Sequence, residues 1–325
     1  MGPAPLARVV RSGLEESVHL GHVAVCDADG RVLARAGDPA HMVFARSCMK
    51  PLQGAVSLHS MGAEPLPDRE MAVLCGSHNG EPVHLGAVRA LLERAGLTPD
   101  ALQTPADYPL DRESMARSQL PNPLFHNCSG KHAGMLLGSV RAGWDPGTYR
   151  RRSHPLQRRV TRAVVRATGV EDPVMGIDGC GVPVHGMPLQ GMATLFARLV
   201  RPERLDHLDA SVDRATTAML TEPYLVGGRA RLDTEVMRVT GDVVVKEGAE
   251  ALVCAAIVPS GIGVAVKVAD GGYRAYGVAL MAALRQLDAV DASHLGELAR
   301  FARPPVKGGG LPVGSVESLL SLKRR

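Results

Sequence analysis

The sequence is poor in aromatic residues and has no long apolar run. Only 3% of its 325 residues are aromatic, so we do not expect the stacking platforms on which proteins bind the bases of single-stranded nucleic acids. No apolar run reaches about 18 residues, the length that spans a membrane. The first residues also lack the apolar core of a signal peptide. We therefore expect a cytoplasmic protein that binds neither nucleic acid nor membranes.

The spacing of the cysteines argues against a small disulfide-bonded scaffold. The cysteines are Cys26, Cys48, Cys75, Cys128, Cys180 and Cys254. They are too dispersed for a small disulfide scaffold and include no C-x-x-C pair, so in a reducing compartment they should be thiols, metal ligands or core residues. The net charge of +4 is small, and the arginine runs at residues 150–152 and 158–159 are interpreted as a solvated face.

Lysine is scarce although basic residues are common. Six of the 37 basic residues are lysines, so arginine carries most of the positive charge. Arginine keeps its proton in proteins, whereas a buried lysine can lose it. Lysines retained against this bias are therefore candidates for amine chemistry, and Lys50, Lys131 and Lys246 are the strongest. Lys307 and Lys323, near the C-terminal tail, are better explained as surface charge.

Ser47 and Lys50 form an S-x-x-K motif at the start of a helix expected over residues 47–59. Residues three apart share one face of a helix, so the amine can reach the hydroxyl. Serine is a weak nucleophile until a neighbouring base removes its proton, and a lysine that its surroundings keep neutral can do so. The pair is thus a candidate nucleophile and base, with solvated charge as the alternative for the lysine.

The pattern of strands and helices predicts an α/β (α+β) chain. A hairpin is expected near the N-terminus, a mainly helical middle over about 47–220, and strands towards the C-terminus, so that one sheet joins both ends of a single unit over 1–325. No G-x-G-x-x-G follows a strand, which disfavours a dinucleotide-binding fold. One helix is expected over 202–220, and 307–310 is interpreted as a flexible linker.

Cys128, Lys131 and Cys180 are candidate metal ligands. Cys128 and Lys131 are three residues apart and can face one point, while Cys180 lies in a glycine-rich segment that can supply a second thiolate. Two thiolates suit zinc. The usual C-x-x-C or H-x-x-x-H spacing is missing, so core cysteines remain the alternative.

Five motifs in one order resemble the L-asparaginase II family of the thermolabile, Rhizobium etli type. They are RSCMKP at 46–51, CGSH at 75–78, NCSGKHAGM at 127–135, DGC at 178–180 and KEGA at 246–249. The resemblance implies a fold like that of serine β-lactamases and glutaminases, and a homodimer. It also implies hydrolysis of L-asparagine to L-aspartate and ammonia.

The resemblance also implies roles for individual residues. Two serine–lysine pairs fall on Ser47 with Lys50 and on Ser77 with Lys246 as the catalytic groups. Zinc is held in the family by two cysteines and a lysine, which fall on Cys128, Lys131 and Cys180. The candidates for substrate binding are Arg46 and Asp178, by their charge, and His132 of the third motif.

Two alternatives remain open at this stage. The chain can be a serine hydrolase of another small amide, such as glutamine or a β-lactam, which a substrate panel would separate. It can also be a noncatalytic, zinc-stabilised binding protein, although both serine–lysine pairs are present.

Overall fold

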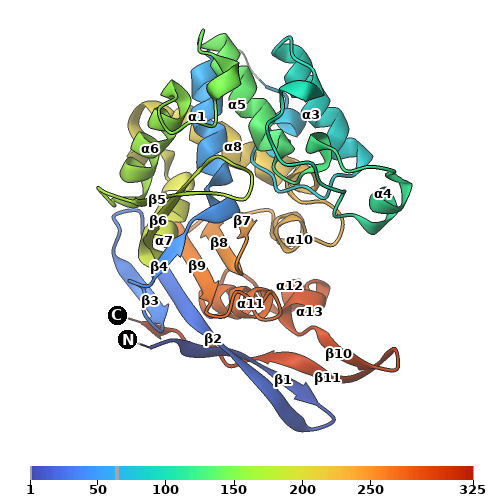
Figure 1. Cartoon of the computed structure of the whole chain (residues 1–325). Helices are drawn as coiled ribbons and strands as arrows, with labels where there is room; N and C mark the ends of the chain where they lie inside the picture. Colours follow the sequence, from blue (N-terminus) through green and yellow to red (C-terminus); the bar gives the residue numbers. More distant parts are fainter. Residues whose placement is uncertain (1, 63–65, 325) are drawn as a thin grey trace. The chain divides into compact units, whose positions relative to one another are not determined.

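The computed structural model describes residues 2–62 and 66–324 (Figure 1). The chain divides into two compact units, which are described separately. Unit 1 comprises Met1–Cys48, Met187–Arg201 and Glu235–Arg325, and unit 2 comprises Met49–Gly186 and Pro202–Thr234. Within the described residues, no helix is both long and apolar enough to cross a membrane.

Unit 1 is built on an antiparallel sheet in the order β10-β11-β1-β2-β9-β8-β7, with β3 paired to β2 and β12 paired to β3. The strands are β1 (Ala4–Arg11), β2 (Leu14–Cys26), β3 (Val32–Ala36), β7 (Val243–Gly248), β8 (Leu252–Ile257), β9 (Ile262–Val268), β10 (Pro305–Gly308), β11 (Leu311–Ser318) and β12 (Lys323–Arg324); β4 (Met42–Phe44) is a further short strand. Strands from both ends of the chain therefore lie side by side.

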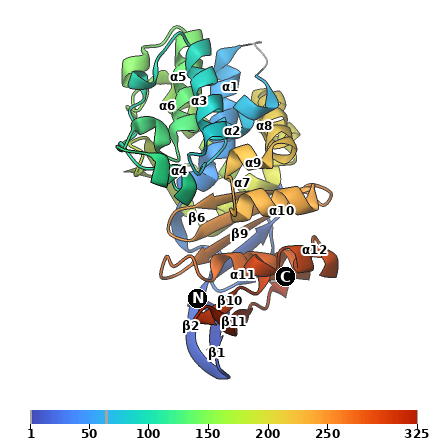
Figure 2. The ribbon, with the colours of Figure 1, turned by 90° about the vertical axis from the view of Figure 1, so that its right-hand side faces the viewer.

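Helices cover both faces of this sheet. Helix α7 (Leu189–Leu199) and helix α11 (Tyr276–Gln286) pack on opposite faces (Figure 2), and α12 (Ala292–Glu297) and α13 (Ala299–Ala302) follow α11. Every residue of β7 and β8 is buried. In β8, which contacts both α7 and α11, this agrees with a sequence that is apolar throughout rather than alternating.

Unit 2 is mainly helical. Its helices are α1 (Lys50–Met61), α2 (Asp68–Leu74), α3 (Pro82–Arg94), α4 (Arg112–Arg117), α5 (Ser129–Arg141), α6 (Pro155–Thr168), α8 (Asp209–Thr221) and α9 (Pro223–Val226), with short 3-10 turns at Pro99–Ala101, Pro123–Phe125, Pro146–Thr148 and Pro202–Leu208. A hairpin of β5 (Val174–Ile177) and β6 (Pro183–Pro188) completes it. The chain passes between the units within the 3-10 turn η1 (Arg46–Met49), within β6, directly before the turn Pro202–Leu208, and within α10 (Leu232–Thr240).

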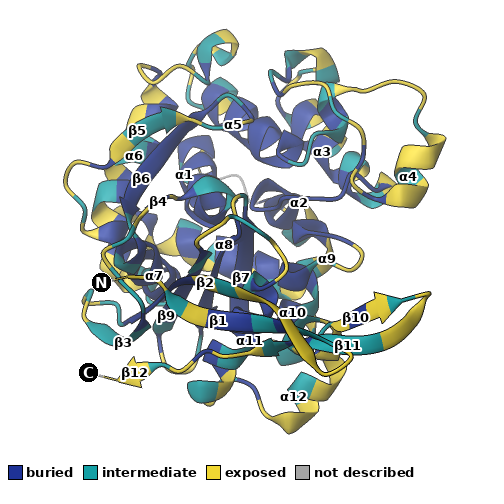
Figure 3. Ribbon diagram, turned by 60° about the horizontal axis from the view of Figure 1, so that its bottom comes forward, coloured by how far each residue is buried: buried dark blue, intermediate teal, exposed yellow. Residues whose placement is uncertain are grey.

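Helix α1 is the central helix of unit 2. It packs against α5, α6 and α8, and all of its residues except His59 are buried, whereas α4 is largely exposed (Figure 3). Glycines four apart on α5 allow the close approach. A Cβ on Gly134 would lie 2.2 Å from Leu74 Cδ1, and one on Gly138 would lie 2.9 Å from the Ser57 carbonyl oxygen. The N-terminal turn of α5 is thereby held close to α1 and α2.

The predicted α/β class is confirmed, including a sheet shared by N- and C-terminal strands and the hairpin before residue 47. Two local predictions are wrong. The helix over 202–220 is broken, because Leu205 and Asp206 have non-helical dihedral angles. Residues 307–310 are not a flexible linker: Lys307 and Gly308 end β10, and Gly309 and Gly310, both at positive φ, form the turn to β11. A single functional unit over 1–325 stays a prediction.

Candidate active site

The three lysines selected from the sequence are the buried ones. Lys50, Lys131 and Lys246 are 1%, 2% and 0% exposed, while Lys307 and Lys323 are exposed. Burying an amine is unfavourable unless it finds hydrogen-bond partners or a counter-charge. The surroundings of each lysine therefore indicate what it does.

Lys50, the first residue of α1, is surrounded by backbone oxygens and a hydroxyl of unit 2. Its Nζ donates to the carbonyl oxygens of Gly76, at 2.7 Å, and Asn127, at 3.3 Å, and lies 2.8 Å from Ser77 Oγ. Carbonyl oxygens only accept hydrogen bonds. When the amine is neutral, its two N–H groups can serve the carbonyls while its lone pair faces the hydroxyl. This is the arrangement in which lysine can take a proton from serine.

Ser77 lies in the buried loop that follows α2. Its backbone N–H donates to the carbonyl of Val226 at 2.7 Å, and the N–H of Asn79 donates to the carbonyl of Gly227 at 2.8 Å. These two bonds tie the loop to the segment after α9 as a short extended ladder. Ser77 itself is only 4% exposed, so its hydroxyl is positioned by backbone contacts on both sides.

His78, the next residue, makes a second polar contact with the start of α5. The backbone N–H of Gly80 donates to His78 Nδ1 at 3.2 Å, so Nε2 carries the proton and donates to Ser129 Oγ at 3.0 Å. The Ser129 hydroxyl in turn donates to the Leu124 carbonyl at 2.8 Å. Burial, with His84 and Lys50 nearby, holds the pKa of His78 well below its usual value. His78 is thus a neutral hydrogen-bond donor.

Cys128, Lys131 and Cys180 meet in unit 2. Lys131 Nζ lies 2.9 Å from Cys180 Sγ, and all three side chains are buried. The pKa of Cys128 is lowered, chiefly by its hydrogen bond with Cys180 and, against the effect of burial, by the charges of Lys50 and Lys131. Burial alone would lower the pKa of Lys131, but the interactions with Cys180 and Cys128 outweigh it and raise that pKa. Without a metal the cluster therefore holds Lys131 as an ammonium beside the Cys128 thiolate.

His132 lies beside this cluster and is fully buried. The backbone N–H of Gln103 donates to the Tyr149 hydroxyl, which therefore donates to His132 Nδ1 at 2.6 Å. The proton is then on Nε2, which has no hydrogen bond of good geometry to any described residue. Burial and Lys131 lower the pKa of His132 to about 4, although the nearby Cys180 opposes this. Nε2–H is available to a sulfur of the cluster.

The donor set of this cluster fits zinc. Over residues 2–62 and 66–324, no group of three or more His, Cys, Asp or Glu side chains is placed to hold a metal ion, so a site here needs Lys131 as its third ligand. Two thiolates and a neutral amine, which must lose a proton on binding, are acceptable zinc ligands and leave one position open. Asp178, half-buried in the turn before Cys180, has Oδ2 4.0 Å from Cys180 Sγ.

The candidate residues of unit 1 lie at η1 and β7. Arg46, directly before Ser47, has φ +45° and pairs with Glu250 at 3.9 Å. Positive φ is unusual for a residue with a side chain and is often found at functional sites. Cys48 Sγ donates to the Lys246 carbonyl at 3.1 Å, which holds η1 against β7.

The structure thus brings together Lys50 with Ser77, and Lys131 with Cys180, inside unit 2. The sequence analysis paired Lys50 with Ser47 and Ser77 with Lys246. Each of those pairs takes one residue from each unit, and both stay predictions.

Sequence reasoning missed several groups that shape the site. The carbonyls of Gly76 and Asn127 that hold Lys50 could not be found by residue type, because every residue has a carbonyl. His78 was noted only as part of the CGSH motif, and its partner Ser129 lies in the NCSGKHAGM motif. Nothing in the sequence pointed to Tyr149.

Comparison with known proteins agrees with the motifs. The chain is similar to solved structures that include a β-lactamase from Mycobacterium bovis, at 18% identity over 82% of this chain and 94% of that one, with a TM-score of 0.45. Another is simvastatin synthase from Aspergillus terreus, at 14% identity over 82% and 95%, with a TM-score of 0.39. No curated protein sequence matches. The family model described as L-asparaginase II matches residues 7–318; the chain belongs to the L-asparaginase II family.

Proposed function

We propose that this protein is an L-asparaginase that hydrolyses L-asparagine to L-aspartate and ammonia. Family and fold point to a hydrolase of the amidase type. The observation that carries the proposal further is the buried Lys50, whose amine is held by two carbonyls at 2.8 Å from a serine hydroxyl. A buried serine–lysine contact of this kind supports amide hydrolysis by general base catalysis.

In the proposed reaction Ser47 is the nucleophile, a role that rests on the family's motif. Lys50 takes the proton from Ser47 Oγ as the Oγ–C bond to the side-chain amide carbon forms. The C–N bond then breaks, the departing nitrogen takes up a proton, and ammonia leaves. Water attacks the resulting ester, releases L-aspartate and returns the proton to Ser47. Ser77, bonded to Lys50, and Lys246 relay protons between these steps.

Substrate recognition is proposed to use charged side chains. Arg46 would meet the α-carboxylate and Asp178 the α-amino group of the substrate. His132 was a third candidate, but its complete burial against Tyr149 is better suited to holding the cysteine cluster than to touching substrate.

We further propose that Cys128, Lys131 and Cys180 hold zinc, which when bound supplies a Lewis acid that orients the substrate. The protein's own part is to keep two thiolates and an amine together. Lys131 Nζ already lies 2.9 Å from Cys180 Sγ, and Cys128 Sγ lies 3.1 Å from Asn127 Oδ1. Asn127 also accepts from Lys50 through its carbonyl, so one residue contacts both groups of side chains.

The deciding experiment measures ammonia release from L-asparagine and L-glutamine by the purified protein and by the Ser47→Ala variant. Release from asparagine that disappears in the variant is the expected result. Faster release from L-glutamine would make glutamine the preferred substrate. Activity retained in Ser47→Ala would show that Ser47 is not the nucleophile. No release from any amide would favour a noncatalytic binding protein.

A further inference from the structure

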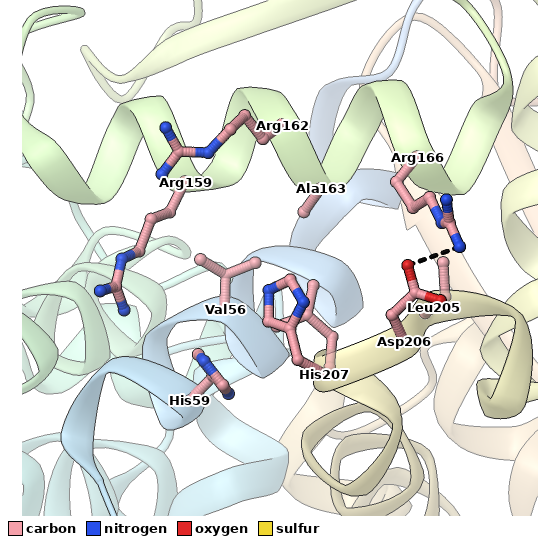
Figure 4. A pocket seen from close by; sticks show the side chains of 10 residues that line it. Val56, His59, Arg159, Arg162, Ala163, Arg166, Leu205, Asp206 and His207 are labelled. Atoms are coloured by element: carbon pink, nitrogen blue, oxygen red, sulfur yellow. Dashed lines mark ion pairs between the residues drawn. The ribbon is translucent and has the colours of Figure 1, made fainter.

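Helix α6 lines a cavity in unit 2 that is separate from the residues discussed above. Its volume is about 410 Å³, within the usual size range of small-ligand sites. Arg159, Arg162 and Arg166 form one wall (Figure 4). His59 of α1 and the residues Asp206 and His207, which precede α8, line the facing side.

The cavity carries an excess of positive charge. The arginines are spaced by three and four residues along α6, which places them on one face of the helix. Among the described residues that line the cavity, Asp206 is the only one with a carboxylate, and it pairs with Arg166 at 2.5 Å. Within the described residues, Arg162 has no ion-pair partner, and Arg159 packs over Trp144, 4.8 Å from its ring centroid. Two guanidinium groups are therefore uncompensated by carboxylates in the cavity.

Other surfaces of the cavity are apolar or aromatic. Val56, Ala163 and Leu205 are buried side chains in its lining. The rings of His59 and His207 meet edge to face at 5.2 Å. Burial and the neighbouring His207 and Arg159 lower the pKa of His59, as expected where positive charge is already in excess. A ligand here meets the cations of α6 together with apolar and aromatic groups.

The backbone is strained where it contributes to this cavity. Asp206 has φ +49° and ψ −127°, a conformation that few residues with a side chain adopt. This strain breaks the helix expected over 202–220 and places Asp206 on Arg166 and His207 beside His59. Strained residues are retained most often at ligand clamps and active sites.

We propose that this cavity binds a small organic phosphate, a phosphate monoester with a body of about sugar or nucleoside size. A monoester carries nearly two negative charges and several acceptor oxygens at neutral pH, and guanidinium groups match it in pairs. A single carboxylate cannot accept from three arginines at once. Inorganic phosphate alone would leave the apolar residues of the lining, Val56, Ala163 and Leu205, without a ligand against them.

The test is isothermal titration at constant ionic strength with ribose 5-phosphate and AMP, beside ribose, adenosine, inorganic phosphate and citrate. Saturable binding of at least one monoester is expected, at least tenfold tighter than that of inorganic phosphate, with no binding of the uncharged analogues. Citrate that binds as tightly as the monoester would overturn the assignment to phosphate. Binding that weakens to nothing at physiological salt would reduce the site to non-specific charge attraction.

Three variants locate the binding. Arg162→Gln removes an unpaired cation from the lining and should weaken binding about tenfold or more. Arg158→Gln removes the same charge from the same helix, but Arg158 does not line this cavity, so binding should be unchanged. Asp206→Asn keeps a residue type that tolerates positive φ and removes a negative charge from the lining, so binding of an anion should tighten. Equal losses in Arg162→Gln and Arg158→Gln would overturn the proposal, as would weaker binding in Asp206→Asn.

Discussion

Lys50 Nζ and Ser77 Oγ lie 2.8 Å apart, which joins the first residue of α1 to the loop after α2. The two residues are 27 positions apart in the chain, and both are almost completely buried. A proton exchanged between two groups at this distance would pass directly rather than through bulk water. The contact gives Ser77 a definite role to test.

Replacing the two serines separately should distinguish nucleophile from relay. We expect Ser47→Ala to lower the rate of ammonia release by about 10⁴-fold or more, as for other catalytic serines. Ser77→Ala should lower it by about 10²- to 10⁴-fold, the range of a general acid–base group. Intact-mass analysis under turnover would locate the acyl group. An acyl group found on Ser77 would make Ser77 the nucleophile in place of Ser47. Full activity of Ser77→Ala would show that Ser77 does not relay protons.

Substitutions of Lys50 should separate catalysis from stability. Lys50→Met removes the donor to the buried carbonyls of Gly76 and Asn127, and each carbonyl left without a partner costs about 1–3 kcal/mol. Lys50→Arg keeps the N–H donors, but its guanidinium group stays protonated and cannot act as a base. We expect Lys50→Met to be inactive and less stable to urea, and Lys50→Arg to be inactive but closer to wild type in stability. Measurable turnover by Lys50→Arg would contradict the role of the amine.

Zinc content should depend on the three proposed ligands. Elemental analysis of protein purified without added metal should find zinc in the wild type and little in Cys128→Ala or Lys131→Arg, because a guanidinium group is not a zinc ligand. Cys26→Ala is the control, since Cys26 is buried in β2, bonded to the Gln190 carbonyl. Cys128→Ala that kept its zinc would refute the ligand set. A chelator should lower the melting temperature of the wild type.

Helix α5 should not tolerate a methyl group on the face that meets α2. In Gly134→Ala the new Cβ would lie 2.2 Å from Leu74 Cδ1, and overpacking of this kind costs about 1–3 kcal/mol. Gly86→Ala on α3 is the matched control, because a Cβ there meets nothing within 4 Å. It should gain up to about 1 kcal/mol from helix propensity. Urea unfolding of both variants measures the difference, and equal stabilities would mean that α5 can shift.

His185 should make the protein less stable in mild acid. Thr161 Oγ1 donates to the Gln157 carbonyl and so accepts from His185 Nε2, at 3.0 Å, while the buried Nδ1 has no partner among the described residues. Burial, with Arg152 nearby, lowers the pKa of His185 to about 4. Between pH 6.5 and 4 the unfolded chain therefore binds a proton that the folded chain does not, and stability falls as pH falls.

The size of this effect is at most about 3 kcal/mol at the acid end of the range, because one pKa unit corresponds to about 1.4 kcal/mol. Unfolding free energies measured in urea at several pH values should fall less steeply in His185→Gln than in the wild type. Parallel curves would show that His185 is protonated in the folded protein.

The sequence was most informative where residue types departed from a bias. The scarcity of lysine singled out Lys50, Lys131 and Lys246, and these are the lysines that folding buries. The strands predicted towards the C-terminus are also present, and in β8 every residue is apolar and buried. Composition and periodicity are reliable in such places because burial itself imposes them.

Other features depend on contacts between distant segments and had no local signal. The contact of Lys50 with Ser77 follows from the way α5 and the loop after α2 close around the start of α1. At Asp206 a strained turn replaces the regular helix. Asp206 pairs there with Arg166, which lies 40 positions earlier in the chain. Neither can be read from neighbouring residues, because the stabilising partner is elsewhere in the chain.

The order of strands in unit 1 also determines when the sheet can be completed during synthesis of the chain. Strand β1 lies between β2 and β11, and β11 (Leu311–Ser318) is synthesised long after β1. Every residue of unit 2 has been made once residue 234 is added, whereas β1 keeps one unpaired edge until β11 has been made. Ribosome-bound chains that stop before β11 should therefore present that edge to chaperones, and protection of unit 2 from proteases should precede protection of unit 1.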